Sequence, residues 1–143
     1  MLSEETVRCD VDVSAAEEAV DELLDLLCTT GGVKDRELAR TDVFANERRS
    51  STGMQHGVAI PHAKTEAVDT LLAAAIVTRR PIDFDSLDGK PSQIFIMTLS
   101  PVDKVGPHLR FLAEIGRLLK SRQARERILR ATSRRELLDA FLD

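Results

Sequence analysis

The sequence contains no tryptophan and no tyrosine, and it has only five phenylalanines. Few side chains are therefore available to stack on bases, and a formal net charge of −4 repels phosphate backbones, so nucleic-acid binding is not expected. No apolar run approaches the ~20 residues of a membrane-spanning helix, so we expect no direct membrane insertion. Ser3, Glu4 and Glu5 stand where a signal peptide would carry basic and then apolar residues. We therefore expect no export signal and a cytoplasmic protein.

Cysteine is also scarce, and the spacing of Cys9 and Cys28 fits neither a disulfide framework nor a metal motif. Both are expected to be free thiols in a reducing compartment. Three histidines could form a zinc site, but His56 and His62 lack the i, i+4 helical spacing and no cysteine or paired carboxylate adjoins them, so no metal is expected. Glycine-rich phosphate loops, dinucleotide fingerprints and nucleophile elbows are missing as well. No cofactor is therefore expected.

The 143 residues, 43% of them hydrophobic, are enough for one domain, which we expect to span residues 1–143. Alternating polarity over Val7–Val13 predicts a half-buried strand, and the apolar segments Leu71–Val77 and Ile94–Leu99 predict central strands buried on both faces. Turn-forming residues over Ser86–Lys90 separate these two segments. Residues 48–64 are expected to form an ordered loop with a short strand at Val58–Ile60.

Helical periodicity predicts a first helix from a capping box of Ser14 and Glu17 to about Thr29. A second, less periodic helix is expected over Val33–Asn46, and a third from Val105 onward. Two short helices capped by Ser121 and Ser133 are expected at the C-terminus, the latter with Glu136 completing a second capping box. Helices at both ends with buried strands between them predict a single α/β domain of two or three layers.

Two histidines are the best candidates for chemistry. His62 follows an apolar strand and Pro61, whose fixed φ would orient the ring, although an inert loop histidine is the alternative. His108 follows Pro107 in the first turn of a predicted helix, where free backbone N–H groups favour an anion, although it could simply cover the end of the apolar face. His56 is expected to be a surface loop residue.

An imidazole ring can act as a nucleophile through one nitrogen while the other holds a proton. It can therefore accept a phosphoryl group without a nucleotide or a metal, provided that a donor protein supplies the group. A second histidine could stabilise the charge on the phosphoryl oxygens. Such a pair suggests phosphoryl transfer between proteins.

Residues 51–65, S-T-G-M-Q-H-G-V-A-I-P-H-A-K-T, resemble the phosphorylation-site motif of the fructose/mannitol-type enzyme IIA domains (PTS EIIA type-2). These domains belong to the bacterial phosphoenolpyruvate-dependent sugar phosphotransferase system (PTS). The stretch Phe84–Pro91, the apolar segment Ile94–Leu99, and His108-Leu109 with Leu112 are also similar to this family, so the resemblance covers essentially the whole chain. S-L-D-G-K-P and P-H-A-K are closer to fructose-type members than to mannitol-type ones.

The resemblance implies an α/β sandwich with a mixed, mostly parallel sheet flanked by helices, and a cytoplasmic phosphotransferase component that uses no nucleotide. It implies that His62 carries the phosphoryl group on its tele nitrogen, Nε2, that His108 stabilises the group, and that Thr52 supports the site. The implied partners are the histidine-containing phosphocarrier protein HPr as donor and a cysteine on a IIB domain as acceptor. The resemblance also extends the set of implied partners to a IIC membrane component associated with IIB.

One position departs from the family pattern, in which Arg-Glu usually stands shortly before S-T-G. This chain has Asn46-Glu47 there, followed by Arg48 and Arg49. If this segment is the frayed end of a helix, position 49 returns to the face of position 46, because i and i+3 are neighbours. We therefore predict that Arg49, ahead of Arg48, supplies the missing charge; the alternative is that both are solvated. Two other roles stay open, a regulatory phosphocarrier similar to the nitrogen-related enzyme IIA proteins and a degenerate member that only binds proteins.

Overall fold

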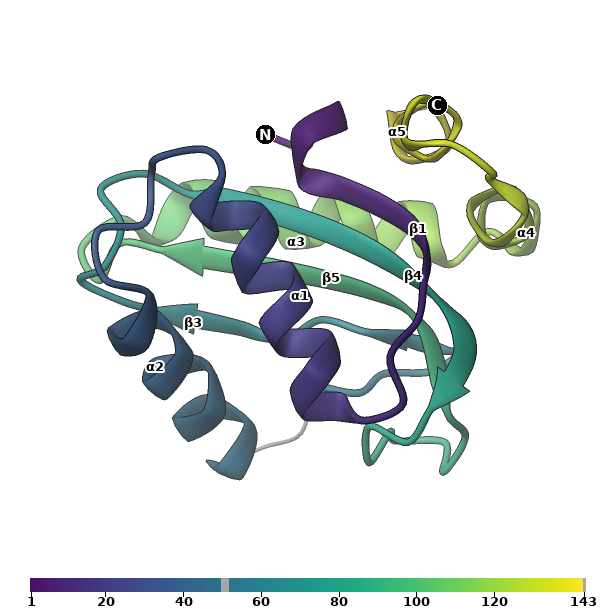
Figure 1. The fold of residues 1–143 in the computed structure, drawn as a ribbon, viewed down its shortest axis with the longest axis horizontal. Helices are drawn as coiled ribbons and strands as arrows, with labels where there is room; N and C mark the ends of the chain where they lie inside the picture. Colours follow the sequence, from purple (N-terminus) through teal and green to yellow (C-terminus); the bar gives the residue numbers. More distant parts are fainter. Residues whose placement is uncertain (50–51, 143) are drawn as a thin grey trace.

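The computed structural model describes residues 1–49 and 52–142 and contains one five-stranded sheet (Figure 1). The sheet has the order β1–β4–β5–β2, and β3 also pairs with β5. Only the β4–β5 pair is antiparallel, so among the described residues the sheet is mixed and mostly parallel, as expected. The strands are β1 (Val7–Val11), β2 (Val58–Ala59), β3 (His62–Lys64), β4 (Leu72–Ile82) and β5 (Ser92–Ser100).

Strands β2 and β3 are two pieces of one path along the edge of the sheet. Val58 pairs with Ile94 and His62 pairs with Thr98, both in parallel. Pro61 lies between the two pieces, and because proline has no backbone N–H it is tolerated at a sheet edge. The strand predicted at Val58–Ile60 therefore stops at Ala59, and the path resumes at His62.

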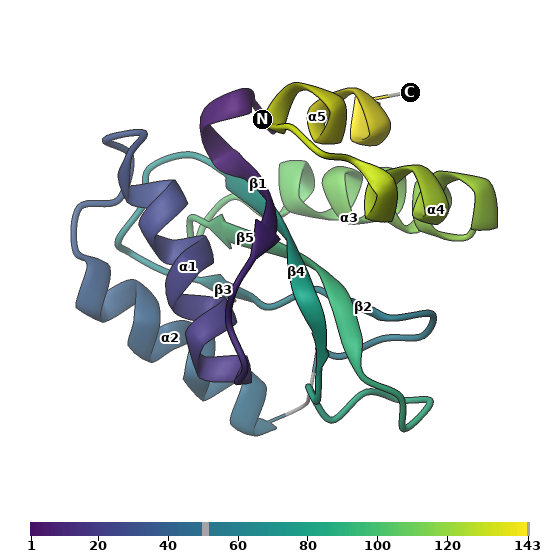
Figure 2. The ribbon, with the colours of Figure 1, turned by 45° about the vertical axis from the view of Figure 1, so that its right-hand side comes forward.

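Helices cover both faces of this sheet, which gives three layers. Helices α1 and α2 lie on one face, and the three C-terminal helices lie on the other (Figures 1 and 2). A separate cluster of buried apolar side chains fills each interface. Within the described residues, no helix combines the length and the apolar character needed to cross a membrane. The helices are η1 (Glu4–Thr6, 3₁₀), α1 (Ala16–Cys28), α2 (Arg36–Arg49), α3 (Val105–Leu119), α4 (Arg122–Arg130) and α5 (Arg134–Leu142).

The start of α1 corrects one prediction. The N-cap is Ala15, one residue later than expected, so Glu18 takes the third helical position instead of Glu17. The Ser14 backbone N–H and hydroxyl both donate to Glu18 Oε1, at 3.2 and 3.0 Å. The predicted Ser14–Glu17 capping box is therefore wrong, because the cap moved by one residue and its acidic partner moved with it.

Helix α2 begins and ends three residues later than predicted, at Arg36 and Arg49. Asp35 explains the start, because its carboxylate accepts the Leu38 N–H at 3.1 Å and satisfies a free donor of the first turn. The preceding Lys34 N–H is used elsewhere and donates to the Ala67 carbonyl at 2.8 Å. The arginines at positions 48 and 49, expected in a loop, are consequently helical.

The caps of the two C-terminal helices agree better with the sequence. Ser121 accepts the Ala124 N–H at 3.2 Å, and Ser133 accepts the Glu136 N–H at 3.1 Å. Both predicted N-caps are therefore confirmed. The predicted Ser133–Glu136 capping box is wrong, because the Glu136 carboxylate accepts the Thr132 hydroxyl at 2.6 Å and not the Ser133 backbone N–H.

Ion pairs fasten α2 to α1. Arg40 Nε is 2.8 Å from Asp21 Oδ1, and Arg36 Nη2 is 3.3 Å from the same oxygen. The Arg40 guanidinium donates to Asp21 and thereby lowers the pKa of that carboxyl, and it also lies 4.7 Å from the centre of the Phe44 ring. These contacts hold α2 in place, and the last turn of α2 carries residues of the candidate site.

Candidate functional site

His62 is the first residue of β3, directly after the break in the edge path. Its Nδ1 lies 2.8 Å from the backbone oxygen of Ile60. A carbonyl oxygen only accepts hydrogen bonds, so Nδ1 carries the proton of the neutral ring and the lone pair is on Nε2. The side chain is half-buried. The nitrogen available as a nucleophile is therefore Nε2, the tele nitrogen.

His108 lies in the first turn of α3, as predicted, and is 6% exposed. Its ring centroid is 5.5 Å from that of His62, with the ring planes at 50°. Burial, followed by the positive charge of His62 when that ring is protonated and by that of Lys64, lowers the pKa of His108 and favours the neutral ring. The structure thus brings together the two histidines that the sequence singled out.

Thr98 was not predicted as a site residue. Its Oγ1 lies 2.9 Å from His108 Nε2, and its side chain is fully buried in β5. A buried hydroxyl needs a hydrogen-bond partner, and His108 provides it. The available signal was a single threonine within the otherwise apolar run Ile94–Leu99.

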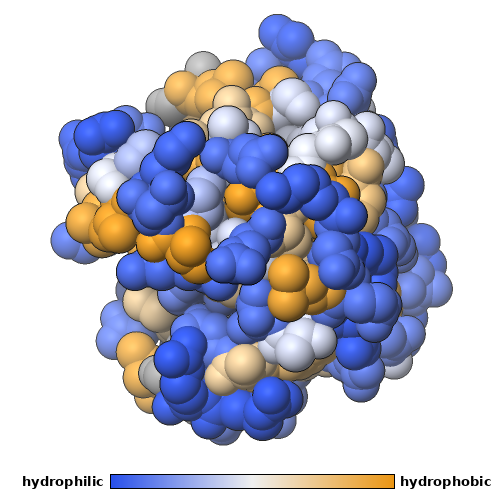
Figure 3. Space-filling model, turned by 90° about the vertical axis from the view of Figure 1, so that its left-hand side faces the viewer, coloured by the Kyte–Doolittle hydropathy of each residue, from blue (hydrophilic) through white to orange (hydrophobic). Residues whose placement is uncertain are grey.

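Two hollows meet at His62. We call the first the polar cleft; it has a volume of about 420 Å³ and is lined by Asp42, Ala45, Asn46, Arg49, His62, Ala63, Lys64 and His108. We call the second the apolar depression; it has a volume of about 370 Å³ and is lined by Asn46, Thr52, Met54, Ile60, His62, Leu112 and Gly116. On the side of the molecule that carries α2, hydrophobic residues occur in small groups between hydrophilic ones (Figure 3).

Thr52 lies beside the strand that carries His62. Its carbonyl accepts the Ile60 N–H at 3.0 Å, and its own N–H donates to both carboxylate oxygens of Glu47, at 3.2 Å each. The Thr52 hydroxyl donates to Glu47 as well. Thr52 is therefore held by the last turn of α2, a link that the sequence pattern did not reveal. Ser51, the first residue of the motif, lies outside the described residues.

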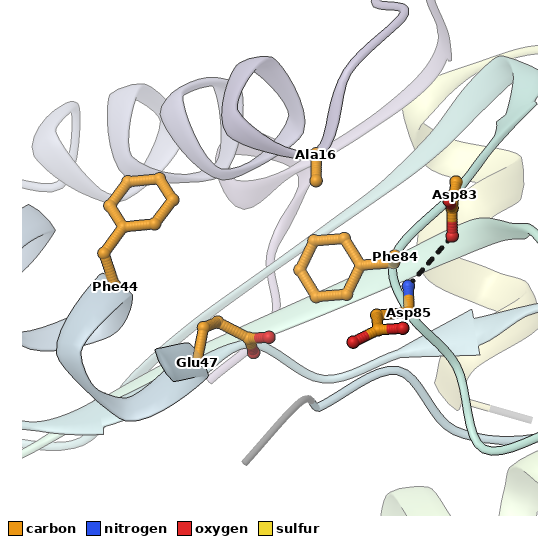
Figure 4. A pocket seen from close by; sticks show the side chains of 6 residues that line it. All are labelled: Ala16, Phe44, Glu47, Asp83, Phe84 and Asp85. Atoms are coloured by element: carbon orange, nitrogen blue, oxygen red, sulfur yellow. Dashed lines mark hydrogen bonds between the residues drawn. The ribbon is translucent and has the colours of Figure 1, made fainter. Parts of the chain in front are cut away.

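Glu47 also lines a groove on the α1 and α2 side of the sheet (Figure 4). This groove has a volume of about 320 Å³, and the rings of Phe44 and Phe84 lie on its two sides below Ala16. Asp83 and Asp85 line its far end, where the Asp85 N–H donates to Asp83 at 3.0 Å. None of the three histidines lines this groove, so it is separate from the polar cleft.

Arg49 and Arg48 differ in position. Arg49 lines the polar cleft, and its Nη2 lies 3.4 Å from Asn46 Oδ1, whereas Arg48 is absent from the described lining of both hollows. His56 is exposed, as expected, and lies in a turn with φ of +64°, followed by Gly57 at +76°. Across residues 1–49 and 52–142, no three His, Cys, Asp or Glu side chains converge in a metal-binding arrangement.

Comparison with known proteins identifies the family of this chain. Residues 1–143 match the family described as phosphoenolpyruvate-dependent sugar phosphotransferase system, EIIA 2, and the chain belongs to that family. The fructose-specific EIIA component of Haloferax volcanii is 33% identical over 139 residues, which cover 97% of this chain and 90% of the relative.

Two further relatives show the range of the family. The fructose-specific EIIABC component of Bacillus subtilis is 30% identical over 139 residues, which cover 97% of this chain but only 22% of that protein. The crystal structure of the nitrogen regulatory protein IIA-Ntr from Neisseria meningitidis is 28% identical and superposes with a TM-score of 0.85, covering 97% of this chain and 94% of that one. The chain is thus similar both to sugar-specific components and to a regulatory protein.

Proposed function

We propose that this protein is a phosphoryl carrier of the sugar phosphotransferase system and that His62 is the residue phosphorylated. The hydrogen bond from His62 Nδ1 to Ile60 carries the proposal, because it keeps the proton on one ring nitrogen and leaves Nε2 free where the two hollows meet. Membership of the EIIA type-2 family supports phosphotransfer, and the Haloferax volcanii relative supports a fructose-type role.

The upstream donor in this proposal is phosphorylated HPr. The Nε2 lone pair of His62 attacks the phosphorus and forms a new N–P bond, while the N–P bond of the donor breaks and its electron pair returns to the donor imidazole. The proton on Nδ1 stays in place and remains hydrogen-bonded to the Ile60 carbonyl. His108, whose ring centroid lies 5.5 Å from that of His62, and Thr52 support the phosphoryl group.

The downstream acceptor is a IIB domain. Its cysteine thiolate attacks the phosphorus, an S–P bond forms, and the electron pair of the broken N–P bond returns to His62 Nε2. The EIIABC designation of the Bacillus subtilis relative supports IIB, together with a IIC component, as the next partners. Phosphoryl transfer between two proteins needs only a transient interface, so we expect weak, rapidly exchanging binding to HPr.

The decisive experiment is incubation with phosphoenolpyruvate, enzyme I and HPr, followed by intact mass measurement and site mapping. We expect one phosphoryl group on His62 and none on a folded His62→Ala variant, because truncation of this half-buried side chain removes little core. His56→Ala is the matched control and should accept phosphate like the wild type. Undiminished incorporation into His62→Ala would refute the assignment.

The similarity to the Neisseria meningitidis IIA-Ntr structure favours a second candidate, a regulatory phosphocarrier that binds partners according to its phosphorylation state. The two candidates differ in where the phosphoryl group goes. Addition of a fructose-type IIB domain should remove the phosphate from His62 if the protein serves transport. A phosphate that persists in the presence of IIB, or a nanomolar complex with a partner, would support regulation.

A further inference from the structure

We infer that Asn46 contacts the phosphoryl group directly and that Arg49 acts through Asn46 as a positioning residue. The inference rests on the proposed phosphorylation of His62. Among the described residues, Asn46 and His62 are the two that line both the polar cleft and the apolar depression. The Asn46 side chain therefore borders the space beside the His62 ring from both hollows.

The contact with Arg49 orients the Asn46 carboxamide. A guanidinium group only donates hydrogen bonds, so the Asn46 atom that faces Arg49 Nη2 at 3.4 Å is the oxygen Oδ1. The amide nitrogen, with its two N–H donors, then lies on the other side of the carboxamide. Within residues 1–49 and 52–142 this nitrogen makes no hydrogen bond, so both donors are available to a phosphoryl oxygen.

The other groups in the polar cleft explain why such a donor matters. Lys64 and Arg49 bring positive charge, Asp42 brings the negative charge of the lining, and the Nε2 of His108 is already bonded to Thr98. A phosphoryl group on His62 carries about −1.5 to −2 charges and three acceptor oxygens. The Asn46 amide can donate to one of these oxygens, and the positive charge of Arg49 on Oδ1 polarises its N–H groups.

An amide also holds the group differently from a cation. An arginine at position 46 would add a full positive charge and a bidentate pair of donors, so it would bind the phosphoryl group more tightly. The Asn46–Arg49 pair keeps the formal charge one side chain away from the reacting oxygens. Phosphorylated His62 is therefore stabilised less than it would be beside an arginine, and the phosphoryl group is easier to transfer to IIB.

Initial rates of phosphorylation by HPr test the assignment of Asn46. Asn46→Asp keeps the shape of the side chain but replaces the donor with a carboxylate, so we expect a loss of about 100-fold or more, the range reported for removing one transition-state donor. Asn46→Arg should accept the group at least as fast as the wild type but pass it to IIB more slowly. A wild-type rate for Asn46→Asp would overturn the role of Asn46.

A double-mutant cycle tests the positioning role of Arg49. Arg49→Ala alone should slow phosphoryl acceptance roughly tenfold, which corresponds to about 1.4 kcal/mol of activation free energy. In a protein that already carries Asn46→Ala, the same substitution should have little further effect. Arg48→Ala is the matched control, with an adjacent arginine that lines neither hollow, and should behave like the wild type. Additive losses would show that Arg49 acts on the phosphoryl group without Asn46.

A second readout does not depend on catalysis. In ¹⁵N-labelled protein, millimolar inorganic phosphate should shift the side-chain amide signals of Asn46, and Arg49→Ala should weaken that shift while Arg48→Ala does not. If the wild type accepts no phosphoryl group from HPr, the proposed function fails, but this titration still decides the inference. Asn46 signals that do not move with phosphate would overturn it.

Discussion

His62 and His108 have different surroundings, and the difference sets their expected roles. His62 is half-buried, with Nδ1 bonded to a backbone carbonyl, whereas His108 is buried with Nε2 next to Thr98. The sequence identified both residues, and the family resemblance implied the tele nitrogen of His62, but no residue pattern shows why that ring nitrogen is free. That depends on the Ile60 carbonyl, whose position follows from the break of the edge strand at Pro61.

Replacement of His108 tests its supporting role. His108→Ala should slow phosphoryl acceptance about 10²–10³-fold without abolishing it, because the residue contributes stabilisation of charge and not the new covalent bond. Rapid-quench measurement of phosphoryl incorporation, with site mapping, checks this prediction. Phosphate found on His108 while His62 stays unmodified would reverse the two roles.

At the scale of elements, hydrophobic periodicity predicted those helices and strands whose apolar side chains are regularly spaced along the chain. Helix α1, helix α3 and strand β5 agree closely with the sequence because each has one continuous apolar face or run. Strand β4 continues beyond the predicted Val77 to Ile82, through two arginines that the apolar pattern excluded. Backbone pairing of Ile82 with Ser92 of β5 continues the strand, and the two arginines remain exposed, where Arg79 Nε lies 3.0 Å from Asp10 Oδ1 and Arg80 pairs with Asp12.

The candidate site was predictable only in part, for a similar reason. The motif pointed to His62 and Thr52, and helical spacing placed Arg49 on the face of Asn46, where the structure has it. The contribution of Thr98 and the bond between Glu47 and Thr52 were not predictable, because each joins two elements whose packing no local pattern specifies. The functional roles of all these residues remain predictions.

The turn at His56 provides a test of the loop before β3. Two successive positive φ values, +64° at His56 and +76° at Gly57, are the conformation of a type I′ turn, which prefers asparagine and glycine. His56→Asn should therefore raise the free energy of unfolding by up to about 1 kcal/mol, because asparagine adopts a positive φ at lower cost than histidine does. Urea denaturation measures this change.

The same variant should leave phosphoryl acceptance unchanged, because His56 is absent from the described lining of both hollows. Gly57→Ala is the opposite control: it introduces a Cβ at positive φ and should destabilise the protein. A slower acceptance rate in a stable His56→Asn protein would instead place His56 in the site.

At the scale of the whole molecule, the site exists only because three layers meet at one sheet edge. Asn46 and Arg49 come from α2 on one face, His108 comes from α3 on the other, and His62 belongs to β3 between them. The histidine pair is therefore a property of the folded state. Unfolding removes both the burial and the neighbouring charges that act on His108, and this links the chemistry of the site to global stability.

The pH dependence of stability tests this link. The pKa of His108 is lowered in the folded protein, mainly by burial, from an ordinary value of about 6.5 that we assign to the unfolded chain. Below about pH 6.5 the unfolded chain consequently binds this proton more readily than the folded protein does. Acidification through that region should lower the free energy of unfolding, whereas at higher pH the group contributes no pH dependence.

His108→Gln removes the titrating ring but keeps a side chain that can hydrogen-bond Thr98. Its free energy of unfolding should therefore fall less than that of the wild type between about pH 7.5 and 5.5, in a series of urea denaturation curves. His56→Gln, which removes an exposed histidine instead, should follow the wild-type pH dependence. If His108→Gln and the wild type lose the same stability over this interval, burial does not hold His108 neutral in the unphosphorylated protein.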